Sequence, residues 1–242
     1  VVHHELQLVP MLTRPDIADS HIIACLRDNF GLRVTQATFL PIGADVDSSA
    51  FRAVADDGTR HFLKLRRGPV NEVAVAIPSF LHAQGIQSIL APISTTANRA
   101  WMEEAGFVWM LYRYVEASNG FEAALSKAQW IALGASMRAV HSAILPPELA
   151  RLVPRENYAA RWRRMVKGFS QQARRGGFAD PIAGRLTSFW ATKSDEIERL
   201  VDRADQLAQA LQKQELDLVL CHGDLHGGNV LLGADDELTI VD

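Results

Sequence analysis

The sequence predicts an α+β protein in which a small antiparallel-sheet lobe is followed by a helical lobe. Three observations support this fold class. Short apolar segments bounded by turn residues crowd into the first 115 residues, as is typical of strands. Apolar residues then recur at helical spacing from residue 126 to residue 214. Two further short apolar runs, residues 218–221 and 230–232, are predicted strands that enclose a polar loop.

Turn signals and alternation predict the elements of the small lobe. The first helix should end at Gly31, because glycine readily adopts the left-handed conformation of a helix stop. Asp57-Gly58 is a strong hairpin signal between two strands. A helix over residues 70–84 should kink or split at Pro78, since proline lacks the required N–H. The strands are expected at residues 34–42, 50–55, 61–66, 89–95 and 107–115.

Helical patterns dominate the second half of the chain. Ser126 and Gln129 form a capping box that begins one helix. Two more helices are expected at residues 158–169 and 181–214. The change from strands to helices near residue 116 marks the predicted domain boundary, with a small lobe at 11–115 and part of a helical lobe at 116–242. Residues 1–10 have no clear period, and we interpret them as a segment upstream of the natural start.

The charge, the cysteine content and the apolar runs of the chain argue against a nucleic-acid-binding, a disulfide-rich or a membrane protein. A net charge of −3 on 242 residues does not favour a nucleic-acid surface. Cys25 and Cys221 make no disulfide framework, which predicts a reducing compartment and a cytoplasmic location. No apolar run is long enough to span a bilayer, so we expect no membrane partner.

The polar loop between residues 221 and 230 concentrates reactive groups. It holds one carboxylate, one amide, two imidazoles and three glycines. Protein kinases use the pattern H-R-D-L-x-x-x-N, in which the aspartate orients the substrate hydroxyl and the asparagine holds magnesium. Here His222-Gly223-Asp224-Leu225 begins in the same way, and Asn229 has the spacing of the magnesium ligand. A following apolar run ends at Asp242, the position of the second metal ligand.

The form His-Gly-Asp-Leu-His-x-Gly-Asn resembles the aminoglycoside phosphotransferase family, which includes choline and homoserine kinases. Within it, the chain resembles the subgroup that phosphorylates spectinomycin at its 9-hydroxyl. The stretches that carry this likeness are residues 41–45, 62–65 and 117–121.

This resemblance implies a two-lobe protein-kinase-like fold that transfers the γ-phosphoryl group of ATP to a hydroxyl of an aminoglycoside or aminocyclitol, with spectinomycin as the expected acceptor. It implies ATP and Mg²⁺ as cofactors, a cationic small-molecule substrate, and a monomer or weak dimer. Family members continue for several more helices after the second metal ligand, so we expect the chain to be C-terminally truncated.

The resemblance also assigns roles. Asp224 would orient the acceptor hydroxyl and take its proton, and Asn229 and Asp242 would hold magnesium. Lys64 would neutralise the α- and β-phosphates while Glu72 holds it in place. Further nucleotide contacts are expected from Ser48 and Ser49 in the turn before the lysine strand, and from the backbone at Arg113 and Val115 in the hinge between the lobes.

Other interpretations stay open. Gly223-Asp224-Leu225-His226-Gly227 also resembles a metal-binding box of two-metal phosphoesterases. The chain could alternatively be a non-catalytic fragment, or a choline- or homoserine-kinase-like enzyme. His222 is expected to brace the loop, and His226 either braces it or lies near the phosphates.

Overall fold

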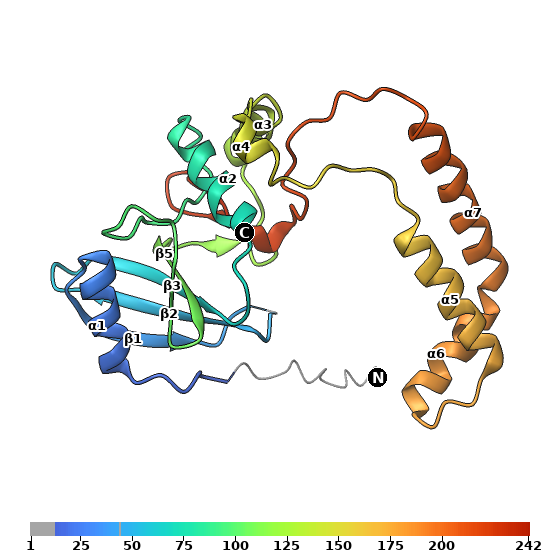
Figure 1. Ribbon diagram of the computed structural model, residues 1–242, viewed down its shortest axis with the longest axis horizontal. Helices are drawn as coiled ribbons and strands as arrows, with labels where there is room; N and C mark the ends of the chain where they lie inside the picture. The colour runs from blue at the N-terminus through green and yellow to red at the C-terminus, as the bar shows by residue number, and fades with distance from the viewer. Residues whose placement is uncertain (1–12, 44) are drawn as a thin grey trace. The chain divides into compact units, whose positions relative to one another are not determined.

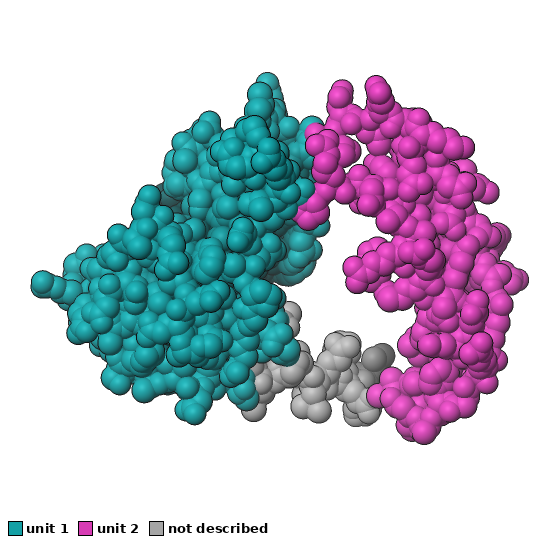
Figure 2. Space-filling model, in the orientation of Figure 1, with its two compact units in different colours: residues 1–153, 219–242 teal, residues 154–218 magenta. Residues whose placement is uncertain are grey.

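The computed structural model describes residues 13–43 and 45–242, so the expected upstream segment 1–10 lies outside the described residues, as does Ala44. The chain forms two compact units, coloured in Figure 2. One contains Val1–Val153 and Val219–Asp242, and the other contains Pro154–Leu218. The lobe boundary expected near residue 116 falls inside the first unit and stays a prediction.

A five-stranded antiparallel sheet forms the base of the first unit (Figure 1). Its order is β1-β2-β3-β5-β4, and the pairing of β2 with β3 follows the hairpin predicted at Asp57-Gly58. Gly58 has φ 84°, the left-handed conformation that glycine allows without strain. The strands are β1 (Val34–Leu40), β2 (Ser48–Ala55), β3 (Arg60–Arg66), β4 (Met102–Glu104) and β5 (Phe107–Arg113).

The strand predicted at residues 89–95 does not form. This segment makes only two isolated bridges, Ile89 with Ile240 and Ile93 with Leu111. Pro92 lies between them, and a residue without an N–H cannot continue a ladder. The segment therefore crosses from one sheet to the other.

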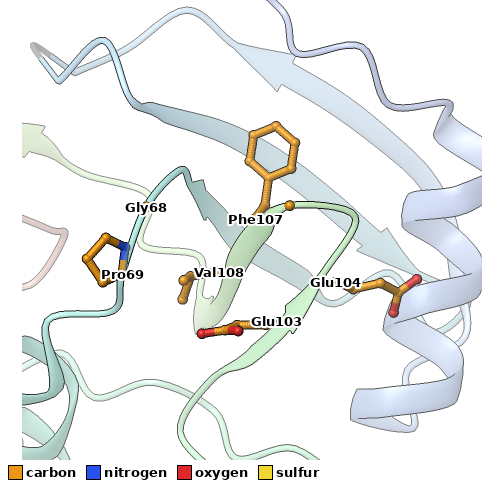
Figure 3. Close-up of a pocket in the computed structure, with 7 residues that line it drawn as sticks. Gly68, Pro69, Glu103, Glu104, Phe107 and Val108 are labelled. Carbon is orange, nitrogen blue, oxygen red and sulfur yellow. The ribbon is translucent and has the colours of Figure 1, made fainter.

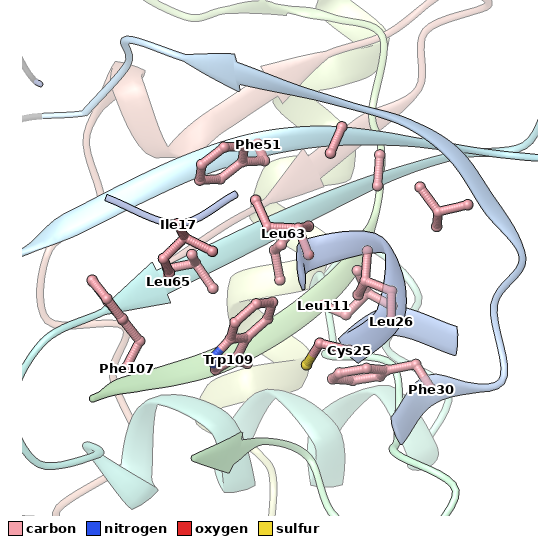
Figure 4. Packing of buried hydrophobic residues seen from close by; sticks show 14 of the residues in the cluster. Ile17, Cys25, Leu26, Phe30, Phe51, Leu63, Leu65, Phe107, Trp109 and Leu111 are labelled. Carbon is pink, nitrogen blue, oxygen red and sulfur yellow. The ribbon is translucent and has the colours of Figure 1, made fainter. Parts of the chain in front are cut away.

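Helix α1 (Asp19–Phe30) covers one face of the five-stranded sheet (Figure 4). Its Leu26 packs in one cluster with Leu63, Leu65 and Trp109, all of them fully buried. The helix ends at Gly31 as predicted, with φ 67° and its N–H donating to the Arg27 carbonyl. Successive side chains of a strand point to opposite faces of its sheet. Alternate residues of β3 thus point into this core, and the residues between them point to the other face.

The other face of the sheet meets helix α2 (Glu72–Ala83). Val75 of α2 packs against Val108 and Met110 of β5. Pro78 does not split α2 into two helices. The carbonyl that lacks its helical partner belongs to Ala74, which is exposed and open to solvent.

A second sheet carries the polar loop. Its order is β6 (Ser118–Asn119), β7 (Val230–Leu232) and β8 (Leu238–Ile240). Helix α3 (Lys127–His141) packs on it and starts with the predicted capping box of Ser126 and Gln129. The short helix α4 (Pro147–Ala150) follows. The strand predicted at residues 218–221 is instead irregular, and Val219 is 51% exposed, because no described strand pairs with it.

The second compact unit consists of α5 (Arg161–Arg175), α6 (Pro181–Thr192) and α7 (Ser194–Leu211). The single helix predicted at residues 181–214 is thus two helices that meet at Lys193. Lys167 of α5 forms ion pairs with Asp202 and Asp205 of α7. Among the helices of residues 13–43 and 45–242, none is both long and apolar enough to cross a bilayer.

Candidate active site

The polar loop is closed by hydrogen bonds between its ends. The side-chain amide of Asn229 donates to the backbone oxygen of Asp224 at 2.9 Å. The backbone N–H of Val241 donates to the Asn229 carbonyl at 3.0 Å, next to the β7–β8 pairing. Asn229 is buried within the 3-10 turn η1 (Gly227–Asn229). Because the amide nitrogen is used inside the loop, the amide oxygen of Asn229 is the atom that could bind a cation.

His222 braces the loop against the end of β8. Its Nδ1 accepts from the backbone N–H of Asp224 at 3.3 Å, and its Nε2 lies 3.1 Å from the Val241 carbonyl. Since Nδ1 accepts, Nε2 carries the proton and donates to that carbonyl. The Asp224 side chain itself is 82% exposed, so its carboxylate can meet a substrate.

Lys64 contacts a different acid from the one expected. Its Nζ lies 2.6 Å from Oδ1 of Asp242. Glu72 begins α2, is exposed, and forms no ion pair within residues 13–43 and 45–242. The structure therefore brings together the predicted phosphate lysine and one predicted metal ligand, and it does not bring Glu72 to Lys64. Burial, and then the Asp242 carboxylate, raise the pKa of the nearby Tyr112 hydroxyl.

The two serines before the lysine strand face opposite sides of the sheet. Ser48 pairs with Arg66 and shares a face with Lys64, whereas Ser49 pairs with Leu65 and shares the face of the α1 core. The Ser48 hydroxyl donates to Asp45 at 2.8 Å. This bond, followed by one from the backbone N–H of Asp47, holds the pKa of Asp45 below its ordinary value.

The predicted hinge residues follow β5. Arg113 ends the strand, and its guanidinium donates to the Thr239 hydroxyl of β8 at 3.1 Å. The next N–H, that of Tyr114, donates to the Arg60 carbonyl. Val115 lies just beyond the strand, and its backbone N–H has no hydrogen-bond acceptor among the described residues. Arg113 thus links the two sheets, while Val115 presents backbone to the surroundings.

Sequence reasoning missed one contact in the loop. The ring of His226 stacks on Phe121, with centroids 5.4 Å apart and planes at 11°. Its Nε2 lies 3.8 Å from Oδ2 of Asp224. The only sequence signal for this contact is the glycine pair Gly227-Gly228, which leaves the backbone uncovered for close packing.

A separate hollow of ≈ 460 Å³ lies beside the turn between β4 and β5 (Figure 3). None of the predicted site residues lines this hollow. It is lined by Gly68, Pro69, Glu103, Glu104, Gly106, Phe107 and Val108.

Comparison with known proteins decides the family. The model of the phosphotransferase enzyme family matches residues 38–242. The chain belongs to this phosphotransferase family. It is therefore a small-molecule phosphotransferase enzyme with the kinase-like fold that the loop motif predicted, and the phosphoesterase interpretation was wrong.

Solved structures of the phosphotransferase family agree. A spectinomycin phosphotransferase, APH(9)-Ia, in complex with ADP and spectinomycin is 31% identical with a TM-score of 0.83, over 94% of this chain and 69% of that one. The AMP complex of the same protein is 30% identical with a TM-score of 0.81, over 93% and 69% of the two chains. An aminoglycoside phosphotransferase from Alicyclobacillus acidocaldarius, at 16% identity and a TM-score of 0.61 over 95% and 66%, shares the fold. No curated protein matches the chain significantly.

Proposed function

We propose that this phosphotransferase moves the γ-phosphoryl group of ATP to a hydroxyl of an aminoglycoside or aminocyclitol, with spectinomycin as the first candidate. The observation that carries the proposal is the exposed Asp224 carboxylate, held on a loop that Asn229 closes. Similarity to a spectinomycin phosphotransferase supports the choice of acceptor. The fold alone would not distinguish this acceptor from choline or homoserine.

Asp224 receives the proton of the acceptor hydroxyl and orients its oxygen for in-line attack. A loose phosphoryl-transfer transition state needs little deprotonation in advance, so an ordinary carboxylate suffices. The brace that His222 forms between the Asp224 N–H and the Val241 carbonyl keeps the backbone of this loop in place. Positioning, more than strong basicity, is what the loop contributes.

Nucleotide binding is assigned to residues 11–115. Lys64 places a positive charge on the sheet face that Ser48 shares, where it neutralises phosphate oxygens. The backbone N–H of Val115, which has no acceptor among the described residues, hydrogen-bonds to adenine, and the backbone of nearby Arg113 belongs to the same site. Ser49 faces the α1 core and pairs with Leu65 in the β2–β3 ladder, which uses its backbone N–H, so we assign it no direct phosphate contact. Glu72 is exposed at the start of α2, and we assign it to a lysine contact only in the nucleotide-bound enzyme.

The oxygen donors of Asn229 and Asp242 fit a magnesium ion. Both are hard ligands, and Mg²⁺ takes few protein oxygens and completes its shell from phosphates and water. Asp242 follows Val241, whose N–H bonds to Asn229, so the two donors come from adjoining segments. When bound, magnesium neutralises charge on the phosphates of the nucleotide. We expect the enzyme to act in the cytoplasm as a monomer or weak dimer on a cationic small molecule.

The test uses the full chain with ATP, magnesium and spectinomycin. Other aminoglycosides, choline and homoserine are run in parallel, and mass spectrometry detects phosphorylated products. We expect phosphorylated spectinomycin, and a loss of at least about 100-fold in Asp224→Ala. Asp217→Ala is the matched control, because Asp217 is an exposed acid of the second compact unit. Phosphorylation of another acceptor would replace the proposed substrate, and no product from any acceptor would contradict the proposal.

A further inference from the structure

His226 is held in one orientation by an aromatic neighbour from a distant part of the sequence. Its ring lies nearly parallel to that of Phe121, with 11° between the planes. The segment that carries Phe121 is fixed to the loop, because the N–H of Gly120 donates to the Gly227 carbonyl at 2.8 Å. The N–H of Phe121 donates to the Asn119 side chain at 2.9 Å. The stacked pair is therefore part of the loop structure.

The glycine pair of the loop is required by this stack. A Cβ on Gly227 would lie 2.8 Å from Cδ1 of Phe121 and 2.9 Å from the carbonyl carbon of Gly120. A Cβ on Gly228 would lie 2.8 Å from Cε1 of His226. Side chains at these positions would displace the rings. The two glycines thus allow Phe121 and His226 to pack directly on the backbone.

The hydrogen bonding of the imidazole determines which nitrogen faces the catalytic carboxylate. Nδ1 of His226 accepts from the backbone N–H of Gly228 at 3.0 Å. In the neutral ring the proton therefore resides on Nε2. Nε2 lies 3.8 Å from Oδ2 of Asp224, which is beyond a direct hydrogen bond and within the range of electrostatic attraction. The positive end of the N–H dipole thus faces the carboxylate.

We propose that His226 is a positioning residue for Asp224, oriented by the Phe121 ring. The inference rests on the proposed function of Asp224. A side chain that is 82% exposed has few contacts to restrict its rotation, and the N–H of His226 favours the rotamer that keeps Oδ2 near the imidazole. Loss of His226 should lower kcat through Asp224 and leave ATP binding unchanged, because the stack contains no predicted nucleotide ligand.

The kinetic test is a double-mutant cycle in the full chain. We expect His226→Ala to lower kcat about tenfold, as loss of a supporting second contact does, with KM for ATP unchanged. Phe121→Leu should lower kcat in the same direction. In an Asp224→Ala background, the His226→Ala change should have no further effect. His141→Ala is the matched control, because His141 is an exposed histidine at the end of α3.

A second measurement does not depend on turnover. Long-range ¹⁵N–¹H correlation spectra report which ring nitrogen of each histidine carries the proton, and His226→Gln identifies the His226 signals. We expect the Nε2–H tautomer, an Nε2 shift that changes in Asp224→Ala, and loss of the single tautomer in Phe121→Leu. The positioning role would be overturned if His226→Ala lowered kcat as much in the Asp224→Ala background as in the wild type. It would also be overturned if the ring ¹⁵N shifts of His226 did not change in Asp224→Ala. If the wild-type chain phosphorylates no acceptor, the proposed function fails and the spectra alone decide this inference.

Discussion

Lys64 Nζ and Asp242 Oδ1 lie 2.6 Å apart, although the two residues are 178 positions apart in the sequence. The contact connects β3 of the first sheet to the second residue after β8. Lys64 is 28% exposed and Asp242 62% exposed, so solvent screens the pair. We therefore expect the contact to contribute more to the arrangement of the active site than to stability.

Replacing Lys64 should separate these two contributions. We expect Lys64→Met to lower kcat/KM for ATP about 10- to 100-fold, the value of a charged hydrogen bond to phosphate. The free energy of unfolding should fall by no more than about 1 kcal/mol, because the ion pair is partly exposed. Steady-state kinetics and urea unfolding measure the two effects. Lys213→Met, at an exposed lysine of the second unit, is the control, and equal losses in both variants would contradict the role of Lys64.

Asn229 should affect both the loop and the magnesium requirement. Asn229→Ala removes the bond to the Asp224 carbonyl in a buried setting, at a cost of about 1–2 kcal/mol in unfolding free energy. It also removes a predicted metal ligand, so half-maximal activity should require more magnesium. Titration of the metal at saturating ATP measures this shift. A variant with reduced stability and an unchanged magnesium titration would remove Asn229 from the metal site.

His61 should make stability depend on pH. The residue is 7% exposed, and its Nδ1 has no partner among the described residues. Burial lowers the pKa of His61 below its ordinary value of 6.5, and Asp57 opposes this effect. As the pH falls below 6.5, the unfolded chain binds a proton that the folded chain does not, so stability decreases.

Urea unfolding between about pH 5 and 8 tests this, with His61→Leu as the comparison. The difference between the two proteins should grow toward low pH. The carboxylates Asp45 and Asp57 also have lowered pKa values, so stability is lost as the pH falls through theirs, in a more acidic range. Parallel pH profiles for the wild type and His61→Leu would show that His61 does not titrate on unfolding.

Two glycines should respond oppositely to alanine. Gly227→Ala places a Cβ 2.8 Å from Phe121, so we expect lower stability and lower kcat. Gly134 lies inside α3, where an added Cβ meets nothing within 4 Å. Gly134→Ala should therefore stabilise the protein by about 0.8–1 kcal/mol through helix propensity. Thermal unfolding of both variants checks the signs, and a stabilising Gly227→Ala would contradict the close packing at the loop.

Local signals in the sequence determined much of the fold. Gly31 ends α1, Asp57-Gly58 turns the β2–β3 hairpin, and Ser126 with Gln129 caps α3, because each involves hydrogen bonds between near neighbours. The spacing of Asp224 and Asn229 likewise placed the loop motif, and the family match agrees with it. The single strand predicted at 89–95 and the single helix predicted at 181–214 were wrong. The spacing of apolar residues does not show where a segment crosses between two sheets or where one helix ends and the next begins.

Only the tertiary structure decided which side chains meet. The sequence suggested Glu72 as the partner of Lys64, whereas in the structure Lys64 contacts Asp242, which follows β8. The stack of Phe121 on His226 joins segments 105 positions apart, because β6 pairs with β7. Such contacts depend on how strands from distant parts of the chain align, and no local pattern of residues encodes that alignment.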